Sequence, residues 1–324
     1  MPKDKLEKSI DKALVFLKNH ERVWQAQASR NSAITALTVM AFLSAGHVPG
    51  EGRYGPVVEK GIRWVLKRQR ANGLIADDGG QEMYQHGIST LMLAEAAGMT
   101  DASIGEEIRQ AVAKAVSVIL KAQRTAGDGR GGWRYRAAHV EGADVSITGW
   151  QVMALRAAHN LGCDVPAEAI DLAIDYIKSC HEQPSGGFRY QPTSHVTIGC
   201  TGTAILVLEI CGKEHHHSQE GLRGGAWLLS KGIQADIPGE AFYYAIYYSS
   251  QATFQLGGNY WKVFRPRMHE ELLRMQDRSG SWDGRGMDAA QGGRAYCTAM
   301  SILALTVEYR FLPIYQRGED PAEK

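Results

Sequence analysis

The sequence has little proline, little cysteine and almost no excess of charge of either sign. Among its 324 residues, Lys and Arg number 36 and Asp and Glu number 35, which leaves a net charge of +1. That balance excludes bulk electrostatic attraction to nucleic acid or to anionic lipid as the main activity. The five cysteines are an odd number and contain no Cys-x-x-Cys pair, so we expect neither a disulfide framework nor a zinc ribbon. A reduced, cytoplasmic protein is the simpler expectation.

Long apolar runs are missing as well. No stretch of about 18 apolar residues occurs, so we expect no transmembrane segment. Residues 1–6 carry charge but lead into no apolar stretch, so we expect no signal peptide within this sequence. Glycine, by contrast, is abundant, with 36 residues against 10 prolines. This balance indicates many tight helix ends and turns and not disorder.

A short apolar segment rich in small residues recurs along the chain. Four clear copies and two weaker ones place equivalent residues at positions 35, 87, 148, 201, 247 and 298. The spacings of 52, 61, 53, 46 and 51 residues are typical of a repeat architecture. The copies begin at Ile34-Thr35-Ala36, His86-Gly87-Ile88, Ile147-Thr148-Gly149, Cys200-Thr201-Gly202, Ile246-Tyr247-Tyr248 and Cys297-Thr298-Ala299.

Each copy follows a segment whose apolar residues recur at steps of three and four, the pattern of a helix with one wet face. These segments are 9–17, 58–69, 111–123, 169–179, 221–230 and 268–276. One half-wet helix and one nearly all-apolar helix, six times over, predict an outer ring of helices around an inner ring. Closing the ring removes the end repeats that an open array must cap. We therefore predict an all-α (α/α)6 toroid as a single domain over residues 1–324, with six repeats over about 5–312 and a short polar tail at 316–324.

Glycine-rich links join the two helices of several repeats, and each link follows a glutamine. Gln123 leads to Gly131-Gly132-Trp133, and Gln183 leads to Gly186-Gly187-Phe188. Related links follow two other glutamines, with Gln69 before Asn72-Gly73-Leu74 and Gln276 before Gly280-Ser281-Trp282. Glycine permits positive φ and close backbone approach, and the aromatic ring can fill the gap between neighbouring outer helices. We expect Trp133 and Phe188 to be buried.

This order of elements resembles the QW-type repeat of the squalene–hopene cyclases and related terpenoid cyclases. A glutamine ends the outer helix, a Gly-aromatic link follows, and a Thr opens the inner helix. The same double ring is similar to the β subunit of the protein prenyltransferases. The resemblance covers roughly residues 5–312. It implies an apolar isoprenoid ligand, but its motifs are specific for the toroid and not for one reaction.

Class II terpenoid cyclases carry an Asp-x-Asp-Asp-Thr-Ala motif at the start of one inner helix, and its middle Asp protonates the substrate alkene. The matching segment here is Asp144-Val145-Ser146-Ile147-Thr148-Gly149. Asp144 matches the first Asp, whereas Ser146 replaces the protonating one. The resemblance thus implies Asp144 as the candidate catalytic residue. Its place at a helix start equally predicts an N-cap, with the carboxylate on backbone N–H groups.

The prenyltransferase β subunits bind zinc through Asp, Cys and His residues at inner-helix starts. Cys200, Cys297 and His86 occupy such places, but no Asp lies two residues before either Cys. The three belong to alternate repeats of a six-fold ring, so they should lie too far apart to share one ion. We predict no metal and no cofactor. The run His215-His216-His217, between two repeats, is predicted to be a solvated linker.

Aromatic and polar residues gather at the predicted starts of the inner helices, where one mouth of the ring would open. Residues 242–248 alone contain five aromatics. Aromatic faces suit apolar ligands and carbocations, and converging helix N-termini would favour an anionic group. Ordinary core packing is the alternative. The predicted substrate-binding residues are Tyr84, His86, Trp150, His195, Tyr243, Tyr244, Tyr247, Arg294 and Tyr296.

Two functions remain open. The first is a divergent isoprenoid (terpene) cyclase or isomerase that acts on an apolar polyprenyl substrate without the usual protonating Asp, with peripheral membrane contact compatible with such a substrate. The second is a non-catalytic toroid that binds an apolar ligand or a protein partner. An enclosed aromatic cavity that contains a carboxyl group would favour the enzyme, and a filled centre would favour the scaffold.

Overall fold

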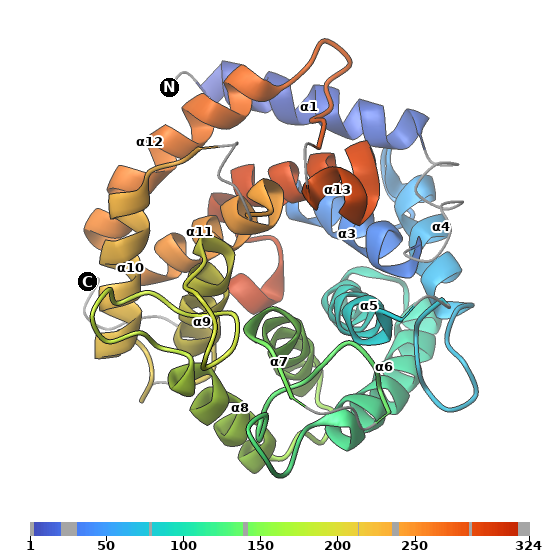
Figure 1. Ribbon diagram of the computed structural model, residues 1–324. Helices are drawn as coiled ribbons and strands as arrows, with labels where there is room; N and C mark the ends of the chain where they lie inside the picture. The colour runs from blue at the N-terminus through green and yellow to red at the C-terminus, as the bar shows by residue number, and fades with distance from the viewer. Residues whose placement is uncertain are drawn as a thin grey trace.

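Helices make up nearly all of the described secondary structure, and they form two concentric rings (Figure 1). The computed structural model describes residues 3–20, 31–77, 80–138, 142–212, 214–234, 240–284 and 287–316. The outer ring consists of α1 (Lys3–Asn19), α4 (Gly55–Leu66), α6 (Ala102–Ala122), α8 (Ala167–Ser179), α10 (Gln219–Lys231) and α12 (Gly258–Met275). The inner ring consists of α3 (Asn31–Ser44), α5 (Glu82–Ala96), α7 (Val145–Asn160), α9 (Ile198–Ile210), α11 (Phe242–Leu256) and α13 (Met287–Leu305).

The predicted all-α toroid is confirmed, since the six outer and six inner helices alternate along the chain. Strand pairing within the described ranges is limited to three isolated bridges. Short 3₁₀ turns follow α5 at Ala97–Met99 and α13 at Val307–Tyr309 and Pro313–Tyr315. None of the described helices is long and apolar enough to cross a bilayer. Residues 317–324 of the predicted polar tail lie outside the described residues.

The inner ring closes on itself. Each inner helix packs against the next, from α3 through α5, α7, α9 and α11 to α13, and α13 packs against α3. Every residue of α9 after Ile198 is buried, whereas the outer helix α6 buries only a stripe. Small residues permit this packing: a Cβ on Gly149 of α7 would come within 2.1 Å of Thr203 Cγ2 on α9. The small residues of the repeat therefore set the spacing of the inner ring.

A glutamine after an outer helix ties that helix to the next one. Gln123 follows α6, and its Nε2 donates to the carbonyl of Ala169 on α8 at 2.7 Å and to the carbonyl of Gly131 at 2.9 Å. The same pair of bonds recurs at two other links, from Gln69 to Ala111 and Gly73 and from Gln276 to Ser9 and Gly280. The last of these joins α12 to α1, so it closes the outer ring.

Glycine allows each link to touch the backbone of the neighbouring outer helix. Gly131 has a φ of 91°, and a Cβ there would lie 1.9 Å from the carbonyl oxygen of Leu172 on α8. Gly280 has a φ of 89°, and its Cβ would lie 2.6 Å from the carbonyl oxygen of Lys12 on α1. A larger residue would face both backbone strain and a main-chain clash, so these positions require glycine.

The aromatic residue of the link is buried between the two rings. Trp133 is fully buried; its Nε1 donates to the Ile119 carbonyl of α6 at 2.8 Å, and its backbone N–H donates to Thr148 Oγ1 of α7 at 3.1 Å. Two other links repeat the bond to threonine, from Phe188 to Thr201 and from Trp282 to Thr298. The predicted burial of Trp133 and Phe188 is confirmed. The recurring threonine holds the link against the inner helix.

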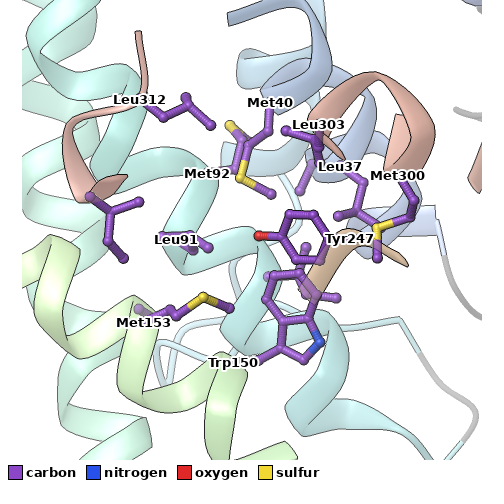
Figure 2. Packing of buried hydrophobic residues seen from close by; sticks show 14 of the residues in the cluster. Leu37, Met40, Leu91, Met92, Trp150, Met153, Tyr247, Met300, Leu303 and Leu312 are labelled. Carbon is purple, nitrogen blue, oxygen red and sulfur yellow. The ribbon is translucent and has the colours of Figure 1, made fainter. Parts of the chain in front are cut away.

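The C-terminal segment fills the end of the inner ring where the helices finish. Leu312 packs among methionine and leucine side chains of the inner helices (Figure 2). The Ile314 N–H donates to Glu95 Oε2 at 3.1 Å, and Gln255 Nε2 donates to the Tyr315 carbonyl at 3.2 Å. The Tyr315 hydroxyl also meets that of Tyr247. This end is packed, so space for a ligand lies at the opposite end, where the inner helices begin.

Replacing Trp133 with Ala should lower the free energy of unfolding by about 3–5 kcal/mol, because a large buried side chain is lost and a cavity is left. Urea denaturation measures the change. Phe311→Ala is a suitable control, because that ring is 48% exposed, and it should cost less than about 1 kcal/mol. An equally small loss for Trp133→Ala would contradict the packing of the link.

Glu95 should make stability depend on pH. Burial raises its pKa to about 8 from an ordinary value of 4.5, so the folded protein binds this proton more tightly than the unfolded chain. The contribution is fully present below pH 4.5 and is lost as the pH rises towards 8. Relative to Glu95→Gln, the unmodified protein should lose about 2 kcal/mol of unfolding free energy between pH 6 and pH 8. Unfolding curves at both pH values test this, and an identical pH dependence in the two proteins would contradict it.

Candidate functional site

A cavity of about 410 Å³ lies where the inner helices begin. Its walls come from all six inner helices and from the links that precede them. The aromatic residues that line it are Tyr84, Tyr135, Trp150, Tyr190, Tyr244 and Tyr296. Aliphatic side chains contribute as well, among them Ile34, Leu37 and Ile88. Polar groups are fewer and include Gln81, Gln85, Ser146, His195, Thr197 and Glu240. Such a volume and lining are those of a small-molecule site.

Five of the nine predicted substrate-binding residues line this cavity. They come from five repeats and are Tyr84, Trp150, His195, Tyr244 and Tyr296. The Tyr84 hydroxyl lies 2.5 Å from Ser146 Oγ, and the Tyr244 hydroxyl lies 2.7 Å from Thr203 Oγ1. Burial raises the pKa of both tyrosines well above its ordinary value, so both hydroxyls stay neutral. Contact of these residues with a substrate stays a prediction.

His86 does not line the cavity but holds a link in place. Its Nδ1 accepts the Ile75 N–H at 3.0 Å, and its Nε2 lies 3.0 Å from the Ala115 carbonyl of α6. Burial lowers its pKa to about 4, which keeps the ring neutral. The bond from Ile75 is the counterpart of the bond that Trp133 donates to Thr148. His86 therefore replaces the threonine of the other repeats, one residue before the position assigned from the sequence.

Three more predicted residues point away from the cavity. Tyr243 donates its hydroxyl hydrogen to the Asp283 carbonyl at 3.2 Å, and Arg294 pairs with Asp277 on the exposed link before α13. Tyr247 lies deeper in the ring, where its ring stacks on Trp150 at 5.7 Å between centroids (Figure 2). Consecutive helical residues point about 100° apart, so a run of tyrosines cannot share one wall.

The sequence analysis missed two tyrosines of the wall. Tyr135 and Tyr190 each lie two residues after the buried aromatic of a link, within the parallel sequences Gly-Gly-Trp-Arg-Tyr and Gly-Gly-Phe-Arg-Tyr. Their hydroxyls form a hydrogen bond with each other. The repeated Arg-Tyr pair could have predicted them, because a residue at a fixed offset from a buried ring directs its side chain the same way in each repeat.

Asp144 is the N-cap of α7 and does not line the cavity. Its Oδ1 accepts the Ile147 N–H at 3.0 Å and the Ser146 hydroxyl at 2.5 Å, and its Oδ2 accepts Arg134 Nη1 at 2.6 Å. The carboxylate is fully buried. Ser146 donates to Asp144, so the neighbouring Tyr84 hydroxyl donates in turn to Ser146. Asp144 thus orients a cavity tyrosine through one intervening hydroxyl.

Glu240 places a carboxyl group in the aromatic cavity. It precedes α11, and its Oε1 accepts the Ile198 N–H at the start of α9 at 2.7 Å. Burial raises the pKa of Glu240, while the N–H groups of Ile198 and Gly199 and the side chain of His195 oppose that rise. The sequence analysis did not single out Glu240, since a link residue outside the repeat carries no periodic signal.

Comparisons with known proteins identify solved structures that have a similar fold. No family model and no curated protein matches the chain. The type II terpene cyclase MstE from Scytonema is 17% identical with a TM-score of 0.62, over 95% of this chain and 100% of that one. The protein geranylgeranyltransferase-I of Candida albicans, complexed with GGPP, is 12% identical with a TM-score of 0.62, over 96% and 94%. An inactive α-1,6-mannanase variant from Salegentibacter, in complex with alpha-1,6-mannotetrose, is 9% identical with a TM-score of 0.67, over 93% and 98%.

These likenesses show the toroid fold alone. The chain shares its fold with a terpene cyclase and a protein prenyltransferase, as the resemblance implied, and equally with a mannanase. Proteins so different in activity use one ring, so the chemistry must be argued from the residues of the cavity.

The Asp144 carboxylate should contribute more to stability than an ordinary N-cap. Asp144→Ala should lower the free energy of unfolding by about 3 kcal/mol, because it removes both the cap and the partner of a partly buried Arg134. Asp144→Asn keeps the bond to Ile147 and should cost less. Asp101→Ala is the matched control: Asp101 caps α6 through Ser103 and Ile104 at an exposed site, and its loss should cost about 1 kcal/mol. Equal losses for the two alanine variants in urea denaturation would contradict a role for the ion pair.

Proposed function

We propose that the protein binds a neutral isoprenoid-like molecule in this cavity and acts on it as a divergent terpene cyclase or isomerase, with Glu240 as the proton donor. The observation that carries the proposal is the carboxyl group among aromatic side chains, with a pKa raised by burial. Burial favours the protonated form of Glu240 more than it would be favoured in an exposed carboxyl group. The Asp144 position, by contrast, offers Ser146 where class II cyclases carry their acid.

The ligand is proposed to be neutral because carboxylates already occupy the starts of three inner helices. Asp144 accepts the Ile147 N–H of α7, and Glu240 accepts the Ile198 N–H of α9. Asp288 accepts the Tyr243 N–H of α11 at 3.3 Å. Helix N-termini attract anions, but these are satisfied by the protein's own acids. The expectation of an anionic group at the mouth is therefore replaced by a neutral polyprenyl chain.

The proposed step transfers one proton from the Glu240 carboxyl to an alkene carbon. The alkene π pair forms the new C–H bond, and the adjacent carbon becomes a carbocation. The faces of Trp150, Tyr84 and Tyr244 are suited to stabilise that charge by cation–π attraction. The Ile198 N–H stabilises the carboxylate left behind. Loss of a neighbouring proton back to Glu240 yields an isomerised or cyclised alkene of unchanged composition.

The second candidate is a toroid that binds the same apolar molecule without acting on it. It is favoured by Ser146, because a hydroxyl in the cyclase acid position cannot protonate an alkene. Both candidates predict binding, and only the first predicts proton transfer. Delivery of the ligand from a membrane surface stays a prediction under either one.

Isotope incorporation separates the candidates. The protein is incubated in D2O with farnesol, geranylgeraniol or squalene, and the recovered lipids are analysed by mass spectrometry. The enzyme is expected to place deuterium at a former alkene carbon, and the rate should fall as rising pH removes the Glu240 proton. Glu240→Gln should abolish incorporation while it retains farnesol binding, measured by quenching of tryptophan fluorescence, because Gln still accepts the Ile198 N–H.

Glu95→Gln is the matched control, since Glu95 is also buried with a raised pKa but lies outside the cavity lining. It should leave deuterium incorporation unchanged. Binding without incorporation would support the non-catalytic toroid. Tighter binding of farnesyl diphosphate than of farnesol would contradict a neutral ligand, and failure of every prenyl compound to bind would overturn both candidates.

A further inference from the structure

The geometry points to a divalent-metal site separate from the cavity, in which Glu209, His216 and His217 bind one Zn²⁺ ion or a similar first-row divalent cation. One ligand atom from each residue lies within 4.8 Å of the other two. Glu209 is at the far end of α9, about 14 Å along the helix axis from Cys200 of the cavity wall. The site therefore belongs to the opposite face of the ring.

A buried carboxylate is the centre of this cluster. The Glu209 side chain has no exposed surface, and its Oε1 accepts the His217 backbone N–H at 2.9 Å. Its Oε2 lies 3.1 Å from His216 Nε2 and 3.8 Å from His217 Nε2. Buried carboxylates in proteins are paired with positive charge or coordinate a metal, because the cost of desolvation is otherwise large. The two imidazole nitrogens converge on one and the same oxygen.

A single metal ion bound to two neutral imidazoles would balance the Glu209 charge better than protonation of both histidines would. The rings of His216 and His217 lie 4.1 Å apart between centroids, so two imidazolium charges would repel each other strongly. A single dication instead accepts a lone pair from each neutral imidazole and from the carboxylate. Two His and one Glu are a donor set that zinc uses, with a water molecule in the fourth position.

The distances from the Glu209 carboxylate oxygen to the two imidazole nitrogens agree with zinc. Tetrahedral zinc with bonds of about 2.0–2.2 Å holds its ligand atoms about 3.3 Å apart. The two distances from Glu209 Oε2, 3.1 Å and 3.8 Å, bracket that value. Small changes in side-chain rotation therefore suffice to close the site on an ion.

The backbone is shaped to present consecutive histidines to one point. His217 has a φ of 55°, a left-handed conformation that residues other than glycine rarely adopt. Ser218 follows and caps α10 through a bond from the Gly221 N–H at 3.2 Å. An ion here would tie the end of an inner helix to the start of the next outer helix. The sequence predicted a solvated linker for the histidine run, and two of its three residues, His216 and His217, instead lie against a buried acid.

The test uses the untagged full-length protein, so that these histidines are the only histidine run. The protein is stripped with EDTA, loaded with ZnCl₂ and passed through gel filtration, and its zinc is counted by elemental mass spectrometry. We expect one zinc per chain and an increase in melting temperature on loading. His216→Ala, His217→Ala and Glu209→Gln should each weaken zinc binding at least about tenfold in competition with a chromogenic chelator.

His215→Ala is the matched control within the same run. Its imidazole lies beside Glu214 and Lys178 and not beside Glu209, so zinc affinity should stay within about twofold of the unmodified protein. Glu209→Gln keeps the acceptor for the His217 N–H, and circular dichroism checks that it folds. Failure to retain zinc, or equal losses for His215→Ala and His216→Ala, would overturn the site, the second result showing an adventitious histidine run.

Discussion

Main-chain contact between successive outer helices is the constraint on which the molecule depends. At each of three links a glutamine amide bonds to a carbonyl of the next outer helix, and at Gly131 the link backbone itself touches that helix. The link after Gln123 then places the buried ring of Trp133 between the two layers and, two residues later, Tyr135 in the wall of the cavity. Ring closure and the construction of the site are therefore served by one short stretch of chain.

The fold was predictable because the residues that produce it recur at a regular spacing along the sequence. Small residues recur about every fifty positions, since each inner helix meets two inner neighbours, and glycine recurs where a link meets a backbone. The exception is instructive. Position 87 was aligned with Thr148, whereas His86 makes the equivalent bond. Alignment by residue size could not detect this, because an imidazole nitrogen and a threonine hydroxyl are interchangeable only as hydrogen-bond acceptors.

The site was predictable only in part, because it depends on the direction in which each side chain points and not only on where the residue stands in its repeat. Tyr243, Tyr244 and Tyr247 share one helix start, yet only Tyr244 faces the cavity. Glu240 accepts its hydrogen bond from Ile198, 42 residues earlier at the start of α9, and Glu209 accepts one from His217 in the loop that follows α9. Neither helix propensity nor the repeat pattern predicts such hydrogen bonds, since they form only when the ring brings separate segments of the chain together.

The closed ring also has a consequence for how the chain folds. Ser9 and Gln276 are 267 residues apart, and Glu95 and Ile314 are 219 apart, yet each pair shares a hydrogen bond. Contacts so distant carry a large loop-closure entropy and are typical of slow folding. During synthesis, the flank of α3 that later receives α13 stays uncovered until nearly three hundred residues have emerged. This seam is among the last apolar surfaces to be covered, and it is where an incomplete ring would be open to chaperones or to exchange with a second chain.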